Sequence, residues 1–256
     1  MARPNIFITG AAGGFGRAVA RRLAREGYFV GLTDLDVGPL RDLADELGGR
    51  EHAHVQRLDV TDVSGARAAV AAFAEATGGR LQVLFNNAGT TAVGDFESVD
   101  IEATRRVLSV NLFGVMNVAH AALPVMRNTP GAHLINVSSA SALHGNPELV
   151  AYSASKRAVL SFSESLDISL RGTGVAVSDL LPMYARTALV EEVAHLHRRA
   201  PRMRLSAEDV AEAVWRTVRT PQFRTYVGND TKAFAALSRV LPYRLRRLLT
   251  RRVLGW

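Results

Sequence analysis

The chain has 256 residues, of which 48% are hydrophobic and 21% are charged, a globular balance that excludes a fibrous or wholly disordered protein. Its longest unbroken apolar run is Ala68–Ala74, whereas a membrane-spanning helix needs about 20 residues. The sequence contains no cysteine, which excludes disulfides, thiolate metal sites and cysteine nucleophiles. No signal-peptide pattern opens the sequence, so the expected location is the cytoplasm.

The net charge of +7 belongs to the end of the chain. Asp230 is the last acidic residue, and seven basic residues follow it: Lys232, Arg239, Arg244, Arg246, Arg247, Arg251 and Arg252. The other 24 basic residues equal the 24 acidic residues in number, so residues 1–230 are neutral. The high isoelectric point therefore describes a tail and does not indicate a nucleic-acid-binding domain.

Short apolar runs alternate with helical patterns along the chain. Strands are predicted at Asn5–Thr9, Tyr28–Asp34, His54–Leu58, Leu81–Phe85, His133–Val137, Val175–Leu181 and Thr225–Val227. Helices are predicted at Gly14–Glu26, Pro39–Leu47, Val63–Thr77, Ile101–Met126 and Ala151–Leu170. Nearly all-apolar strands separated by helices indicate an α/β fold, a Rossmann-like doubly wound parallel sheet of about seven strands with helices on both faces. No linker divides residues 1–230, which we predict to form one domain, followed by a basic amphipathic tail at residues 231–256.

A glycine-rich turn, TGAAGGFG at residues 9–16, lies between the first strand and the first helix. Glycines at this point let the backbone approach a pyrophosphate held by the N–H groups of the helix N-terminus. We therefore predict that Gly10, Gly14, Phe15 and Gly16 bind a dinucleotide. The alternative is a turn that only closes a tight strand–helix connection.

The second strand ends at Asp34, whose carboxylate can accept hydrogen bonds from the adenine ribose hydroxyls and repels a 2′-phosphate. Its sequence neighbours, Thr33 and Leu35, carry no positive charge. The sequence therefore favours NAD over NADP. The alternative is that Asp34 or Asp36 only caps the following helix.

Tyr152 and Lys156 are separated by four residues at the start of a predicted helix, which places them on one face, one turn apart. A tyrosine that transfers protons near neutral pH needs a pKa below its usual value of about 10, and a neighbouring ammonium favours that change. Of the 31 basic residues only Lys156 and Lys232 are lysines. A lone ammonium at this position favours a catalytic role over a solvated surface pair.

These motifs, with LDV at residues 58–60, NNAG at 86–89, SVN at 109–111 and NVSS at 136–139, resemble the short-chain dehydrogenase/reductase superfamily over about residues 5–228. The resemblance implies that Ser139 hydrogen-bonds the substrate oxygen. It also implies that Asn111 holds a water next to Lys156 at a helix irregularity. The same resemblance implies cofactor contacts for Asp59, Val60, Asn86, Ala88, Gly89, Tyr152, Lys156, Pro182 and Thr187.

One departure from the family pattern follows the sixth strand, where Met183 replaces the usual glycine after Pro182. In the family the next segment, here about residues 187–205, closes over the substrate as a lid. Its apolar content, with Leu143 and Tyr184, favours a hydrophobic alcohol or ketone. A plain packing helix is the alternative.

The tail places Leu245, Leu248, Leu249 and Val253 on one helical face and Arg244, Arg247 and Arg251 on another. Such a helix can lie weakly on an anionic membrane surface, pack on the body or join an interface between subunits. Packing is the favoured interpretation. The resemblance also implies a homodimer or homotetramer.

The predicted function is an NAD(H)-dependent oxidoreductase that interconverts a secondary alcohol and a ketone through Tyr152, Lys156, Ser139 and Asn111. No metal is expected, since the paired histidines at positions 52 and 54 and at 195 and 197 lack a third ligand at metal spacing. The alternative function is a catalytically silent dinucleotide-binding or regulatory protein of the same fold.

Overall fold

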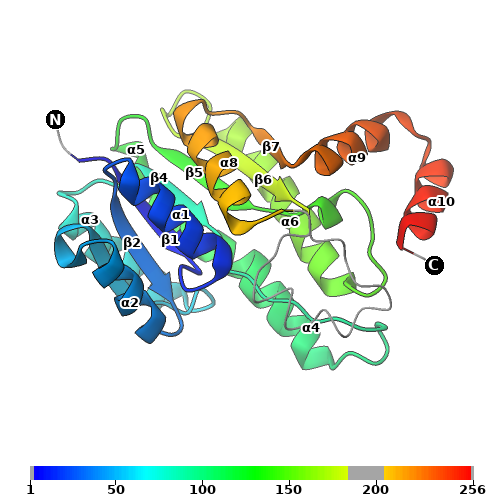
Figure 1. Ribbon diagram of the computed structural model, residues 1–256, viewed down its shortest axis with the longest axis horizontal. Helices are drawn as coiled ribbons and strands as arrows, with labels where there is room; N and C mark the ends of the chain where they lie inside the picture. Colours follow the sequence, from blue (N-terminus) through cyan, green and yellow to red (C-terminus); the bar gives the residue numbers. More distant parts are fainter. Residues whose placement is uncertain (1–2, 184–204, 255–256) are drawn as a thin grey trace.

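The computed structural model describes residues 3–183 and 205–254. Within these residues one seven-stranded, all-parallel sheet has the order β3-β2-β1-β4-β5-β6-β7 (Figure 1). The strands are β1 (Asn5–Thr9), β2 (Phe29–Asp34), β3 (Ala53–Arg57), β4 (Val83–Asn86), β5 (His133–Val137), β6 (Ala176–Pro182) and β7 (Arg224–Val227). The predicted fold class is confirmed, with each strand within two residues of its expected bounds.

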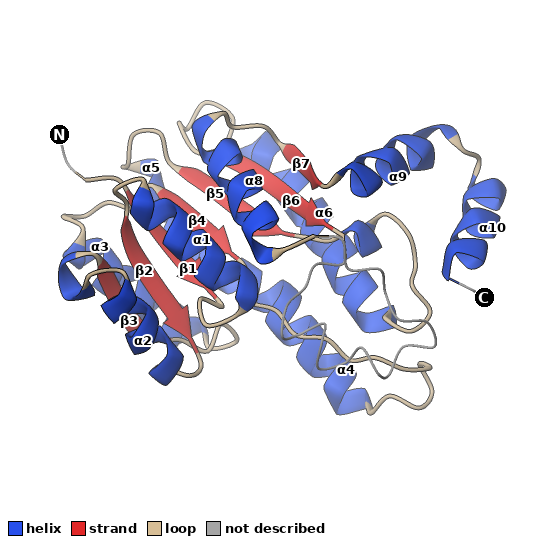
Figure 2. Cartoon of the chain, in the orientation of Figure 1, coloured by secondary structure: helices blue, strands red, loops and turns tan. Residues whose placement is uncertain are grey.

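Helices cover both faces of the sheet (Figure 2). One face carries α1 (Gly14–Arg25), α2 (Gly38–Glu46) and α8 (Ala207–Arg219). The other carries α3 (Val63–Ala76), α5 (Val115–Arg127) and α6 (Val150–Ser169). Successive side chains of β1 divide between the two layers, since Ile6 and Ile8 pack with α1 while Phe7 packs with α3. A continuously apolar strand is thus buried on both sides, as the sequence indicates.

Short polar side chains begin several of these helices. The carboxylate of Asp62 accepts the Ser64 N–H at 2.9 Å at the start of α3. Ser206 and Asp209 form a reciprocal capping box at the start of α8. These side chains satisfy N–H groups that no helical carbonyl can reach.

One helical segment is continuous from Ile101 to Arg127, through α4 (Ile101–Leu108), a π turn (Ser109–Gly114) and α5. By length and composition this segment could cross a membrane, a test that core helices of soluble proteins also pass. Here Val118, Ala122 and Met126 are buried against the sheet. The π turn is the helix irregularity that the family resemblance implies at Asn111.

After β7 the chain forms α9 (Asn229–Val240) and α10 (Tyr243–Leu254), and α10 stands apart from the sheet (Figure 1). Leu245 and Leu248 are exposed on α10, whereas Arg247 and Arg251 line a cavity against the body. Leu245 and Leu248 are therefore not buried against the body, and packing of the tail against a second subunit stays a prediction. Lys232 lies exposed on α9.

The predicted lid, about residues 187–205, lies outside the described residues except for Leu205. Tyr184 and Thr187 lie outside them as well.

The stability of the fold depends on pH through one buried histidine. His133 is 2% exposed on β5, and its Nε2–H donates to Ser178 Oγ at 2.7 Å, because the Ser178 hydroxyl itself donates to the Gln222 carbonyl. Burial lowers the pKa of His133 from 6.5 to about 4. The stability that comes from the neutral imidazole is therefore present above pH 6.5 and lost as the pH falls toward 4.

In the wild type, this effect should lower the free energy of unfolding by about 3 kcal/mol as the pH falls from 6.5 to 4. We predict that His133→Gln, which keeps a donor for Ser178, does not show this loss. Urea unfolding at a series of pH values measures this difference. His120→Gln is the matched control, because His120 is exposed on α5. A His133→Gln variant with the wild-type pH dependence would contradict the assignment.

Candidate active site

A cleft of about 390 Å³ opens at the carboxyl ends of the strands, where the strand order reverses between β1 and β4. This switch point is where open α/β sheets bind ligands. Ten of the predicted site residues line it: Gly10, Gly14, Phe15, Asp34, Asp59, Val60, Ala88, Gly89, Tyr152 and Lys156. Segments far apart in the sequence thus meet in one cleft.

The glycine-rich turn approaches the end of β4 closely. Gly10 has a φ of +68°, and a Cβ added there would lie 2.8 Å from Ala88 Cα. A Cβ on Gly16 would lie 2.3 Å from the Gly10 carbonyl oxygen. Gly10 therefore shapes the floor of the cleft, while Gly16 lets α1 pack against the turn and does not line the cleft.

Asn87, which directly follows β4, holds the glycine-rich turn in place through hydrogen bonds. Its side-chain amide donates to the carbonyls of Thr9 and Gly10 at 2.9 and 3.0 Å. The backbone N–H groups of Asn87 and Ala88 both donate to Thr9 Oγ1 at 3.0 Å. The ends of β1 and β4 are thus held at a fixed separation on either side of the cleft.

The N-terminus of α1 faces the cleft through Gly14 and Phe15, and no side chain caps it. Uncapped N–H groups and the positive end of the helix dipole suit an anion such as a pyrophosphate. A Cβ on Gly10 would remove the close approach that this turn makes. The chain's own residues therefore fit the phosphate end of a dinucleotide.

Two carboxylates line the cleft next to the ends of β2 and β3. Asp34 accepts the N–H groups of Ala12 and Leu35 at 3.0 and 2.7 Å. Hydrogen bonds from the Thr61 hydroxyl and backbone N–H hold the pKa of Asp59 below its usual value. Asp34 also ties the glycine-rich turn to β2, a contact that the sequence did not predict.

The register of β2 and β3 places Arg57 opposite Asp34. No basic residue adjoins Asp34 in the sequence, but the fold brings one to the neighbouring strand. Arg57 does not itself line the cleft.

Tyr152 and Lys156 lie one turn apart on α6, and both reach the cleft. The Lys156 ammonium is 5.7 Å from the centroid of the Tyr152 ring and donates to the Val137 carbonyl at 2.9 Å. Ser138, at the end of β5, donates through its hydroxyl to the Lys156 carbonyl at 2.8 Å. The end of β5 therefore holds both the backbone and the side chain of the lysine.

The pKa of Tyr152 departs from the sequence prediction. Burial raises it above the usual value of 10, and a hydrogen bond with the Ser139 side chain opposes that change. The sequence analysis expects the Lys156 ammonium to favour a lower value, but in the protein alone burial is the larger effect on this pKa, and the ammonium donates to the Val137 carbonyl. Ser139 is the protein group that makes the phenol more acidic.

Lys156 is only 3% exposed, and burial lowers its pKa to about 8, an effect that the charge of Asp179 opposes. Asp179 is fully buried on β6, and burial raises its pKa to about 7. Two ionisable groups of opposite sign thus share the interior behind the cleft. The sequence analysis did not identify Asp179, whose acidic side chain interrupts an apolar strand.

Asn111 is fully buried in the π turn. Its side chain exchanges hydrogen bonds with the backbone N–H and carbonyl of Thr90 at 2.8 and 2.9 Å, and donates to Ser155 Oγ at 3.1 Å. Asn111 therefore joins the loop after β4 to the helix that carries Tyr152 and Lys156. The implied water beside it stays a prediction.

Four further predicted residues do not line the cleft and lie close behind it. Asn86 is buried and donates to the Asn136 side chain and the Val115 carbonyl, at 3.0 and 3.3 Å. Ser139 begins a turn at residues 140–142 and accepts the Ser141 N–H at 3.2 Å. Pro182 ends β6, and Asn111 lies in the π turn. Thr187 is outside the described residues.

The cleft also contains residues that the sequence analysis missed: Gly13, Thr33, Leu35, Leu58, Asn87, Thr90, Arg106, Val110 and Val137. Arg106 brings a guanidinium from α4, and Val110 follows it by one helical turn. That spacing was the available signal, since both residues share one helical face.

The family model for short chain dehydrogenases matches residues 4–197. The chain belongs to this family. It is 35% identical over 224 residues to sulfoacetaldehyde reductase 2 of Chromohalobacter salexigens, covering 84% of this chain and 88% of that one.

Two solved structures show the same architecture. A short-chain dehydrogenase/reductase of Burkholderia phymatum in complex with NAD aligns with a TM-score of 0.83 and 30% identity, over 92% of each chain. An alcohol dehydrogenase of Thermococcus sibiricus complexed with 5-hydroxy-NADP aligns with a TM-score of 0.77 and 25% identity, over 87% of this chain and 95% of that one. The chain is thus an oxidoreductase of the short-chain dehydrogenase family that uses a nicotinamide dinucleotide.

The close approach of the glycine-rich turn gives a direct test. We predict that Gly10→Ala lowers the free energy of unfolding by at least about 2 kcal/mol and abolishes dinucleotide binding, because the new Cβ meets Ala88 backbone at a positive φ. Thermal unfolding and NAD titration measure both effects. Gly145→Ala is the control, since a Cβ there has no neighbour within 4 Å. Wild-type stability and affinity in Gly10→Ala would refute the assigned constraint.

Proposed function

We propose that this short-chain dehydrogenase is an NAD(H)-dependent enzyme that interconverts a secondary alcohol and a ketone on a hydrophobic substrate. The observation that carries the proposal is the geometry of α6, which brings Tyr152 and Lys156 to the cleft one turn apart, with the Lys156 ammonium 5.7 Å from the centroid of the Tyr152 ring. A silent binding protein has no need for a buried lysine beside a half-buried phenol at the open end of a dinucleotide cleft. Their desolvation is unfavourable unless the two groups act together.

The dinucleotide is held by the residues already described. Gly10, Gly14 and Phe15 would receive the pyrophosphate at the α1 N-terminus, and Asp34 would accept the adenosine ribose hydroxyls. When bound there, a nicotinamide would supply the hydride chemistry of the reaction. The protein supplies orientation and proton transfer.

In alcohol oxidation Tyr152 accepts the hydroxyl proton of the substrate, and in carbonyl reduction it donates that proton to the carbonyl oxygen. Ser139 donates a hydrogen bond to the same oxygen, on which negative charge develops. Without substrate the Ser139 side chain favours the phenolate form of Tyr152, and with substrate bound its single hydroxyl proton is donated to the substrate oxygen instead.

Lys156 holds the geometry of this pair. Its ammonium is anchored at Val137 and lies near Gly89, where an added Cβ would be 3.6 Å from Nζ. From this position the three ammonium donors can serve a ribose hydroxyl as well as the Val137 carbonyl. Asn111 supports the same arrangement by binding Thr90 and Ser155 on either side.

A second candidate reaction comes from the relatives. The similar protein of Chromohalobacter salexigens is named as a reductase of sulfoacetaldehyde, an anionic aldehyde. The proton-transfer chemistry at Tyr152 and Ser139 is the same for an aldehyde and a ketone. Parallel assays of matched aldehydes and ketones, neutral and anionic, distinguish the two candidates.

Two hydrophobic side chains support the proposed homodimer or homotetramer. Phe113 on the π turn and Ile168 near the end of α6 are 56% and 69% exposed. Large apolar side chains that are exposed on neighbouring helices are typical of surfaces that a second subunit covers.

The proposed preference for NAD rests on the carboxylate of Asp34. A substitution that removes this charge tests the preference, because Arg57 on the neighbouring strand then remains. Asp34→Asn keeps an acceptor for the Ala12 N–H but removes the charge that repels a 2′-phosphate, leaving Arg57 opposite it. We predict that the ratio of kcat/KM for NADP to that for NAD rises about tenfold or more.

The control for this substitution is Asp36→Asn. Asp36 is an exposed acid that binds the Gly38 N–H and does not line the cleft. An equal change in both variants, or no change in Asp34→Asn, would show that Asp34 does not select the cofactor.

The catalytic assignment is tested by Tyr152→Phe, which removes the proton donor and keeps the ring. We predict a loss of at least about a thousandfold in kcat with either cofactor and an NAD affinity within a few fold of the wild type. Tyr28→Phe is the matched control, because Tyr28 packs against Trp215 away from the cleft. Substantial turnover by Tyr152→Phe in an alcohol and ketone panel would overturn the mechanism.

A further inference from the structure

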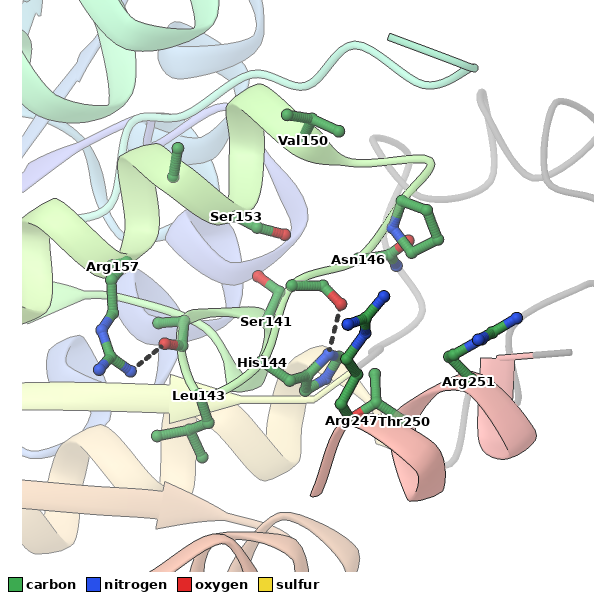
Figure 3. A pocket seen from close by; sticks show the side chains of 14 residues that line it. Ser141, Leu143, His144, Asn146, Val150, Ser153, Arg157, Arg247, Thr250 and Arg251 are labelled. Atoms are coloured by element: carbon green, nitrogen blue, oxygen red, sulfur yellow. Dashed lines mark hydrogen bonds between the residues drawn. The ribbon is translucent and has the colours of Figure 1, made fainter. Parts of the chain in front are cut away.

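A second cavity of about 630 Å³ lies between α10 and the start of α6 (Figure 3). Its lining residues come from three places: the segment 141–147 after Ser139, the outer side of α6, and α10. It shares no lining residue with the dinucleotide cleft. Its volume is within the range of about 300–1,000 Å³ that is typical of small-molecule sites.

The charged residues that line this cavity are all positive. Three arginines line it, Arg157 from α6 and Arg247 and Arg251 from α10, and none of its described lining residues is acidic. Arg157 is already engaged, since its guanidinium donates to the Ala142 carbonyl at 2.7 Å. The exposed Arg247 extends from α10 toward His144 and Asn146 (Figure 3). Arg247 is therefore directed at whatever enters the cavity from the side of α10, and Arg251 lines the cavity from the same helix.

Most of the remaining wall is apolar. It is formed by Ala142, Leu143, Pro147, Val150 and Ala154. An inorganic anion would leave this wall in water, whereas a molecule with an apolar chain and an anionic head would cover it.

Two buried serines also belong to the wall of this cavity. Ser141 and Ser153 line it at 9% and 7% exposure, and within the described residues neither hydroxyl oxygen has a hydrogen-bond partner. Unpaired buried hydroxyls are unfavourable, and rotation about χ1 would turn either hydroxyl toward the cavity, where a polar ligand atom would satisfy it.

The C-terminal arm, which consists of α9 and α10, contacts the body beside this cavity. The ring of Phe234 on α9 meets the His144 ring edge-on, with the centroids 4.9 Å apart. The arm and the segment that follows Ser139 therefore contact each other directly. This contact positions α10 over the opening.

We infer that this cavity is a binding site for an anionic amphiphile, a molecule with a carboxylate or similar head and an aliphatic chain. The chain lies on the apolar wall of α6 and the 141–147 segment, and the head meets Arg247 and Arg251. Such a ligand contacts the neighbours of both Ser139 and Tyr152 without entering the dinucleotide cleft. The binding itself does not depend on the proposed reaction.

Octanoate is the probe, titrated calorimetrically into the full chain, with octan-1-ol and acetate as its neutral and chainless counterparts. We expect octanoate to bind and the two counterparts to bind at least about tenfold more weakly. Arg247→Gln and Arg251→Gln should each weaken octanoate binding about tenfold, the usual effect of losing one charge-assisted hydrogen bond.

Arg244→Gln is the matched control, because Arg244 is exposed on the same helix and does not line the cavity. Ala154→Phe fills the apolar wall and should also abolish binding. Absence of octanoate binding, equal binding of octan-1-ol, an equal loss in Arg244→Gln, or unchanged binding in Ala154→Phe would each overturn the proposal. None of these measurements requires turnover, so their failure is distinct from a failure of the proposed reaction.

Discussion

The site depends on a cation that the fold keeps away from water. Lys156 is almost fully buried, and its ammonium is held by the Val137 carbonyl at the end of β5. Removing a charge from water is unfavourable, so the surroundings must fix its position and satisfy its donors. Ser138 holds the lysine backbone, and Asp179 supplies a negative charge from the next strand. Much of the polar structure behind the cleft therefore serves to place one amine.

Most of the fold was predictable because its signals are local. A continuously apolar strand followed by an amphipathic helix determines a β–α unit, and repetition of that unit gives the parallel sheet. Gly10 was also predictable, since the turn it occupies needs a positive φ that glycine adopts readily. Tyr152 and Lys156 share a helical face by spacing alone.

Other parts of the site depend on contacts between distant segments. Asn87 binds the carbonyls of Thr9 and Gly10, and Arg57 lies opposite Asp34 only because β2 and β3 pair in that register. The pKa of Tyr152 could not be predicted from the nearby lysine alone, because burial raises it and the Ser139 side chain opposes that rise. Helical periodicity separated the leucines of α10 from its arginines but did not indicate which side meets the body.

The scarcity of lysine has a practical consequence for labelling chemistry. Of the two lysines, Lys156 is shielded in the interior, while Lys232 is exposed on α9. Among side chains, an amine-selective dye or cross-linker therefore reacts at a single place on the native surface. That place is on the same helix as Phe234, so an attached fluorophore would report movements of the C-terminal arm while leaving the chemistry of the cleft unmodified.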